Sequence, residues 1–326
     1  MSFRNWVSSF FPGGARFCRL RNFTYFPGRR GSGSSFLFQS RRARRPSHSS
    51  FSRPQKFLRR SNAARLTLVA IILVALRAFG AGGDSTESAP NAISIAAAAD
   101  LKFALDDLVK QFQEKYPATK ANVTYGSSGN FFAQLQNGAP FDLFLSADIS
   151  YPQKLAEKGL GADDVFPYAI GRLVVWVPKD SPVDLDKLGI KSLLEPSVHK
   201  IAVANPEHAP YGRAAFAALK TLNLYDQVAS RLVYGENIAQ TAQFVQSGAA
   251  DIGLLALSLA VSPQMHDAGR YWPVPLEAYP RMEQGGIILR SSKNLQLARA
   301  FRDFVLGDGG RAVLQQYGFS LPGQNP

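Results

Sequence analysis

The sequence predicts an α/β protein in which mostly parallel sheets are flanked by helices. From about Asn91 onward, short apolar runs rich in β-formers alternate with segments whose apolar residues recur at helical spacing. These units fall into two clusters followed by a helical tail. The roughly 240 residues after Gly83 can bury a sizeable core, and their number permits one or two compact lobes.

The first cluster opens with a short run made mostly of Ile and Ala. Residues 93–99 (ISIAAAA) indicate a buried strand, and Asp100 after it is a good N-cap for the helix that follows. Residues 141–146 (FDLFLS) alternate as a strand does, directly after a turn at 137–140. In chain order the cluster predicts strands at 93–99, 122–125 and 141–146. It also predicts three helices: one that begins near 101, one that follows 126–129 and runs through 135, and one at 151–158.

The second cluster repeats the same rhythm of strand and helix. It predicts strands at 173–177, 201–204, 232–234 and 251–257, with helices at 188–194, 211–222 and 238–247. A strand at 286–289 and helices near 295–306 and 309–317 close the chain. The joins near 171–172 and 281–286 do not resemble flexible linkers, so we expect the chain to cross between lobes there.

The net charge of the chain is unevenly distributed. Of 37 basic residues, 16 lie between Arg4 and Arg77, and no acidic residue precedes Asp84. From Asp84 onward 21 basic residues face 24 acidic ones, a net charge of −3. The overall charge of +13 therefore belongs to the leader, and a nucleic-acid partner is not expected.

Residues 1–83 are interpreted as a leader in two pieces. Residues 1–55 lack periodicity and would be a disordered extension, or the product of a start codon assigned too far upstream. Residues 56–82 have the pattern of a cleaved signal peptide: a basic segment, the 11-residue apolar run Leu66–Leu76, and small residues at 80–82. The run is too short to span a membrane, which takes about 20 apolar residues.

Two other interpretations of the leader remain open. Its Arg and Ser content without acidic residues is also typical of an organellar transit peptide. The pair Arg59-Arg60 suggests a twin-arginine signal, but polar Ser61 and Asn62 follow it and favour the general secretory route. Either export route predicts a body outside the cytoplasm. Cys18 lies in the leader, so the body has no cysteine for disulfides or thiolate chemistry.

The body carries no recognisable catalytic motif. Its histidines are His199, His208 and His266, and no P-loop, GxSxG elbow, GxGxxG turn or HExxH sequence is present. Glu207 and His208 are adjacent and do not have the spacing of metal ligands. We therefore expect neither an enzyme nor a bound cofactor.

Four strand-to-helix junctions carry small or polar residues. A helix N-terminus presents unpaired backbone N–H groups and a positive dipole end, and small residues allow an anion to approach them. Each junction alone is more simply a capped helix. Two lie in each cluster, and facing lobes would bring all four to one cleft. The junctions are at 99–101, 127–129, 209–212 and 236–238.

The ordered set of motifs resembles the periplasmic molybdate-binding proteins of ABC transporters. The matching segments cover most of residues 93–319: AAAADL at 96–101, SSGN at 127–130, NGAPFDLFLSAD at 137–148, NPEHAPYG at 205–212, GENIAQTAQFVQSGAADIGLLALS at 235–258 and GRAVLQQYGF at 310–319. The resemblance implies a two-lobed type II periplasmic binding fold with a ligand cleft between the lobes. The first lobe would comprise 91–171 and 282–326, and the second 172–281.

The resemblance also implies the ligand, the partners and the contacts. A monomer in the periplasm would capture molybdate, and tungstate with it, and deliver the anion to an ABC permease at the inner membrane. Ser128 falls on a family serine that contacts the anion, and Ile238 on a position that donates its amide.

The sequence departs from the family in two places at the site, the start of the first helix and Ala256. Ala99 and Asp100 stand where the family often has serine; we expect Asp100 to cap its own helix and leave the local amides to the ligand. Ala256 replaces a family tyrosine, and Tyr211 could supply a phenol from the opposite helix or pack on the cleft rim. The oxyanion contacts would be Ser128, Tyr211 and Ile238, none of them bonded to the metal itself. The departures leave open a binding protein for another small anion, or a ligand-sensing domain of the same fold.

Overall fold

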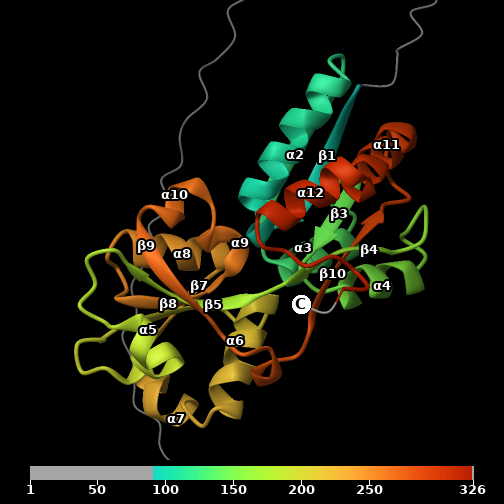
Figure 1. The fold of residues 1–326 in the computed structure, drawn as a ribbon. Coiled ribbons are helices and arrows are strands. Elements are labelled where there is room, and N and C mark those ends of the chain that lie inside the picture. The colour runs from blue at the N-terminus through green and yellow to red at the C-terminus, as the bar shows by residue number, and fades with distance from the viewer. Residues whose placement is uncertain (1–90, 325–326) are drawn as a thin grey trace, which may run out of the picture. The chain divides into compact units, whose positions relative to one another are not determined.

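A computed structural model describes residues 91–324, all within one compact unit, Phe79–Pro326. The predicted extension and signal peptide lie outside the described residues. Within 91–324, no helix is both long and apolar enough to cross a membrane. Two five-stranded sheets form the framework, and Figure 1 shows each with its own group of helices.

The first sheet has the strand order β2-β1-β3-β10-β4. β1 pairs in parallel with β2 and β3, whereas β10 runs antiparallel to β3 and β4. Its strands are β1 Ala92–Ala98, β2 Lys120–Gly126, β3 Leu143–Ser146, β4 Phe166–Gly171 and β10 Met282–Ile288. Its helices are η1 Ala99–Leu101, α2 Lys102–Lys115, α3 Ser128–Gln136, α4 Ser150–Glu157, α11 Leu295–Leu306 and α12 Asp308–Gln316. We call this sheet with its helices the first lobe.

The second sheet has the order β7-β6-β8-β5-β9 and the same mixed pattern. β6 is parallel to β7 and β8, and β5 is antiparallel to β8 and β9. Its strands are β5 Leu173–Pro178, β6 Ile201–Ala204, β7 Leu232–Gly235, β8 Ile252–Ala256 and β9 Gly269–Pro273. Its helices are α5 Leu185–Leu188, η2 Gly189–Leu194, α6 Pro210–Thr221, α7 Tyr225–Val228, η3 Ala229–Arg231, α8 Ile238–Gln246, α9 Leu257–Ala260, α10 Pro263–His266 and η4 Leu276–Ala278. We call this the second lobe.

The predicted fold class is confirmed, with one refinement. Each sheet is mixed because one strand, β10 or β5, runs against its neighbours. Strands β4 and β9 were not predicted from the sequence; each lies at one edge of its sheet, whereas β2 and β7 at the opposite edges were predicted. Pro167 interrupts the apolar pattern of β4, and β9 begins at Gly269 and ends at Pro273, residues that strands tolerate mainly at edges.

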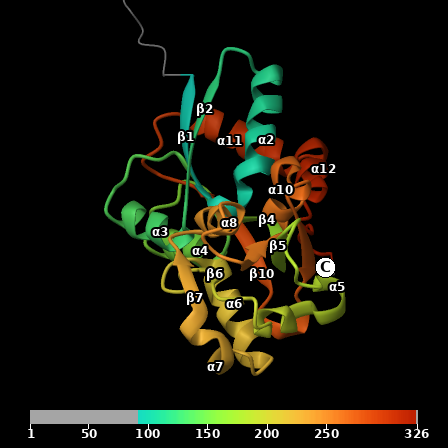
Figure 2. The same cartoon turned by 90° about the vertical axis from the view of Figure 1, so that its left-hand side faces the viewer.

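The largely apolar sequence of β1, broken only by Ser94, is explained by burial on both faces. Ile95 and Ala97 pack in one core cluster with Phe112 of α2 and Phe301 of α11, whereas Ala96 packs in another with Phe131 of α3. A strand covered on both faces needs no polar alternation. The run therefore reflects the central place of β1. In Figure 2, α2 lies to the right of β1, and α3 lies to its left and below.

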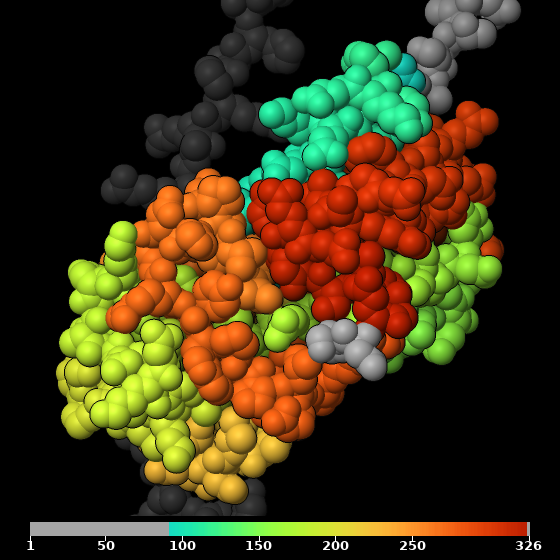
Figure 3. Space-filling view, in the orientation of Figure 1, coloured from blue at the N-terminus to red at the C-terminus, as the bar shows by residue number. Residues whose placement is uncertain are grey.

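The chain crosses between the lobes twice. Only Arg172 separates β4 from β5, and residues 274–281 lead from β9 to β10. The C-terminal segment returns to the first lobe, where Ser320 and Ile170 exchange backbone hydrogen bonds of 2.8 and 3.1 Å. Figure 3 shows the C-terminal residues, in red, lying over the first lobe and reaching the orange surface of the second.

Candidate functional site

A small cavity lies where the helix N-termini of the two lobes meet. Its volume is about 10 Å³, close to the space that one water molecule needs. All five site residues predicted from the sequence are among its lining residues, which are Ala98, Ala99, Asp100, Gly126, Ser127, Ser128, Ala147, Ala209, Pro210, Tyr211, Asn237 and Ile238. We call it the interlobe cavity.

Backbone and side-chain contacts hold the lobes together around this cavity. The Gly129 amide of α3 donates to the His208 carbonyl across the lobes at 2.9 Å. Ser258 of α9 donates its hydroxyl to the Asp100 carbonyl at 2.7 Å. A Cβ at position 129 would lie 2.7 Å from the His208 carbonyl oxygen, so this close approach requires glycine. The structure is therefore the closed form of the two-lobed body.

Asp100 is buried and turned toward the first sheet. Its side chain is 1% exposed, and its Oδ2 accepts a hydrogen bond from Nε2 of Gln284 on β10 at 2.6 Å. Neither η1 nor α2 has a side-chain cap. The expectation that Asp100 caps its own helix is therefore wrong, because the carboxylate is engaged by a residue 184 positions away.

Burial dominates the electrostatics of this carboxyl. It raises the pKa of Asp100 to about 6, opposed most strongly by the Gln284 hydrogen bond. Two phenols share the same dry environment. Burial, followed by the nearby Asp100 charge, raises the pKa values of Tyr168 and Tyr211 well above their usual range. Both phenols thus stay protonated and can donate hydrogen bonds at neutral pH.

The two serines at the start of α3 differ in their partners. Ser128 is fully buried, and its Oγ accepts the Ala147 amide at 3.0 Å, which leaves the hydroxyl proton available. The hydroxyl that the family resemblance assigns to the anion therefore also holds the Ala147 amide. Ser127 is also buried, and among residues 91–324 its Oγ has no hydrogen-bond partner.

The second lobe contributes a capped helix terminus and a phenol. Asn237 accepts the amides of Ala239 and Gln240 at 3.0 Å each, and this cap does not take the amide of Ile238. Tyr211, in the first turn of α6, is 2% exposed, and its hydroxyl lies 3.5 Å from Gln284 Nε2. It therefore lies inside the cavity wall and not on the cleft rim.

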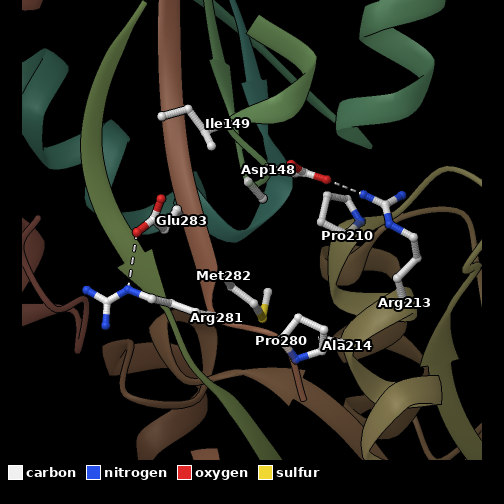
Figure 4. Close-up of a pocket in the computed structure, with 10 residues that line it drawn as sticks. Asp148, Ile149, Pro210, Arg213, Ala214, Pro280, Arg281, Met282 and Glu283 are labelled. Atoms are coloured by element: carbon white, nitrogen blue, oxygen red, sulfur yellow. Dashed lines mark hydrogen bonds and ion pairs between the residues drawn. The ribbon is translucent and has the colours of Figure 1, made fainter. Parts of the chain in front are cut away.

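A larger cavity of about 520 Å³ adjoins the first and shares Ala147 and Pro210 with it. Figure 4 shows its charged residues paired with one another. Arg213 of α6 binds Asp148 at 2.6 Å, and Arg281 binds Glu283 at 3.2 Å. Because each cation already has a carboxylate partner, this cavity, which we call the Arg213 cavity, has no uncompensated positive charge for an anion.

Residues 91–324 contain no group of three or more His, Cys, Asp or Glu side chains able to hold a metal ion. A ligand of the interlobe cavity would therefore meet hydroxyls, amides, a phenol and one carboxyl.

The two lobes are joined by chain crossings and meet around one small cavity. This arrangement is typical of a solute-binding protein. Residues 93–320 match the family of bacterial extracellular solute-binding proteins, and the chain belongs to that family. It is 36% identical to the molybdate-binding protein ModA of Azotobacter vinelandii over 75% of this chain and 96% of that protein. It is 33% identical to the ModA of Rhodobacter capsulatus, over 73% and 91% respectively.

Solved structures agree with this assignment. The periplasmic molybdate-binding protein of Azotobacter vinelandii superposes with a TM-score of 0.66 and 32% identity, covering 71% of this chain and 99% of that one. The sulfate-binding protein SubI of Mycobacterium tuberculosis superposes with a TM-score of 0.58 at 15% identity, which shows the shared fold alone. The predicted family and non-enzymatic class are confirmed.

Three residues of the site were not among those predicted. Ser127 and Asn237 belong to the strand-to-helix junctions that the sequence marks, so the same junction argument could have found them. Gln284 carries no such signal. It lies within a strand, and only the pairing of β10 into the first sheet brings it to Asp100.

Proposed function

We propose that this protein captures molybdate, and tungstate with it, for import by an ABC transporter. The observation that carries the proposal is the convergence of four helix N-termini from two lobes on one small cavity that contains no lysine, arginine or histidine. Such a donor set binds a dry oxyanion through hydrogen bonds and selects it by size and geometry. The names of the relatives support molybdate among the oxyanions.

In this proposal each predicted residue has a defined role. Ser128 donates its remaining hydroxyl proton, Ile238 its backbone amide, and Tyr211 its phenol. The backbone at Ala99 and Asp100 supplies the N–H groups of the first junction. Ser127, whose buried hydroxyl lacks a partner among residues 91–324, joins this set as a third side chain.

The lobes would act as a hinged pair. Residues 91–171 with 282–326 would move against 172–281 about the two crossings, and ligand contacts from both lobes would favour the closed form. An exported monomer would carry the anion through the periplasm to its permease at the inner membrane. Export would remove the predicted signal peptide, so the mature protein would begin near residues 81–84.

Ligand-dependent stability tests the proposal. A ligand that binds only the folded state stabilises it by about 2.7 kcal/mol at 100 times its dissociation constant. We expect molybdate and tungstate to raise the melting temperature, and sulfate and phosphate at equal concentration to raise it much less. An equal response to all four anions would assign the site to another anion or to none in particular. No response to any of them would refute an oxyanion-binding function.

A further inference from the structure

The interlobe cavity contains one group that is chemically out of place in an anion site. Asp100 lines the cavity, is 1% exposed, and would oppose a dianion with a negative charge of its own. Its Oδ2 is held by Gln284, and among residues 91–324 no hydrogen bond of normal geometry reaches its Oδ1, although the Tyr211 hydroxyl and the amides of Asp100 and Leu101 lie close enough to lower the pKa of the carboxyl. A buried carboxyl oxygen without a partner is costly unless a ligand or a proton completes it.

Within residues 91–324, no cation compensates this carboxyl. The groups facing it from the first sheet are Tyr168 of β4 and Gln284 of β10, and from α6 the phenol of Tyr211. Among residues 91–324, Asp100 forms no ion pair with lysine, arginine or histidine. All three neighbours are uncharged at neutral pH.

The helices packed on η1 do not add a charge either. α8 has no ionisable residue, and α9 contributes the Ser258 hydroxyl, which binds the Asp100 carbonyl and not its carboxyl. On α2, Lys102 and Asp106 pair with each other at the surface at 2.7 Å. The charge of Arg172 at the nearby crossing acts on the phenol of Tyr279.

We propose that the protein binds its oxyanion together with one proton, which is shared between Asp100 Oδ1 and an oxygen of the anion. This inference rests on the proposed function and deepens it, because it makes Asp100 the residue that couples capture to pH. The proton comes from bulk water when the lobes close. It converts a repulsive carboxylate–oxyanion contact into a charge-assisted hydrogen bond, whichever of the two oxygens formally carries it.

The pH dependence follows from the free protein. Since burial raises the pKa of Asp100 to about 6, the carboxyl is mostly ionised above that pH before the anion arrives. Binding must then take up a proton, and the dissociation constant should rise about tenfold per pH unit above that value. Below it Asp100 is already protonated, and this contribution to the pH dependence disappears.

Calorimetry can count the proton directly. Tungstate is titrated into the protein at pH 6.5, 7.5 and 8.5, each in two buffers of different ionisation enthalpy. We expect the wild type to take up close to one proton per anion at the two higher pH values. Asp100→Asn, which keeps a hydrogen-bond donor but cannot titrate, should take up none and should bind at least about tenfold more tightly than the wild type at pH 8.5. Asp226→Asn, the same change at an exposed position of α7, should behave as the wild type does.

The outcomes separate this inference from the function on which it rests. Wild-type binding with no proton uptake and a flat pH profile overturns the role of Asp100 but leaves the oxyanion site standing. If neither tungstate nor molybdate binds the wild type at any pH, both proposals fail together. The wild-type proton count needs no variant, so the test remains decisive even if Asp100→Asn does not fold.

Discussion

The two lobes close the interlobe cavity with different kinds of groups. The first lobe supplies buried side chains with unused capacity, namely the Asp100 carboxyl and the Ser127 hydroxyl. The second lobe supplies a finished helix terminus, in which Asn237 already satisfies two amides. We call the two sides of the interlobe cavity its walls. The first wall, formed by the first lobe, has polar groups without partners in the absence of a ligand, whereas the second wall, formed by the second lobe, is already organised by the fold. Substitutions at Asp100 and Ser127 should therefore act mainly on binding or protonation, and loss of the Asn237 cap mainly on stability.

The largest expected effect concerns protonation of the first wall. In the folded protein, burial raises the pKa of Asp100 from 3.8 to about 6. Protonation of Asp100 therefore stabilises the fold below pH 4, and this stabilisation is lost as the pH rises through about 6. Two pKa units correspond to about 3 kcal/mol. The free energy of unfolding of Asp100→Asn minus that of the wild type should therefore increase by about 3 kcal/mol between pH 4 and pH 7. Denaturant melts of both at each pH measure this difference, and a constant difference would show that the carboxyl titrates normally.

A second effect separates the two adjacent serines. Ser128→Ala leaves the buried Ala147 amide without its acceptor, which should cost about 1–3 kcal/mol of stability in addition to any loss of binding. Ser127→Ala removes a hydroxyl that has no partner among residues 91–324, so the apo protein should melt almost unchanged. Equal destabilisation by both variants would mean that Ser127 has a partner after all.

The preorganised wall is tested by removing its cap. Asn237→Ala should destabilise the apo protein by about 1 kcal/mol, since the amides of Ala239 and Gln240 lose their acceptor. Asn237→Ser keeps a capping side chain and is the matched control. Should Asn237→Ala leave the melt untouched and weaken only ligand binding, the contrast between the walls would be wrong.

The predictable part of the site is the part set by local chain chemistry. Ser128 and Ile238 follow a strand directly and begin a helix, and such junctions are visible in a single sequence. The contact between Asp100 and Gln284 is not, because it joins residues 184 apart through the antiparallel insertion of β10. The helix-capping role expected for Asp100 came from its position after a strand. In the fold, its carboxyl is buried and accepts a hydrogen bond from Gln284 instead.

The same distinction holds for the fold. Buried central strands such as β1 and β8 are almost entirely apolar and were predicted. The edge strands β4 and β9 are bounded or interrupted by Pro and Gly, and only pairing with a neighbour makes them strands. Which edge of a sheet they occupy is decided by long-range pairing that a local pattern does not encode.

The most direct test of the account is to locate the bound anion. Crystals of the protein grown with tungstate would show the tungsten by its anomalous scattering. We predict one strong tungsten peak in the interlobe cavity. The oxygens around it should lie within hydrogen-bonding distance of the Ser128 hydroxyl and the Ile238 amide. A peak in the Arg213 cavity instead, or none in either cavity, would contradict the assignment of this site.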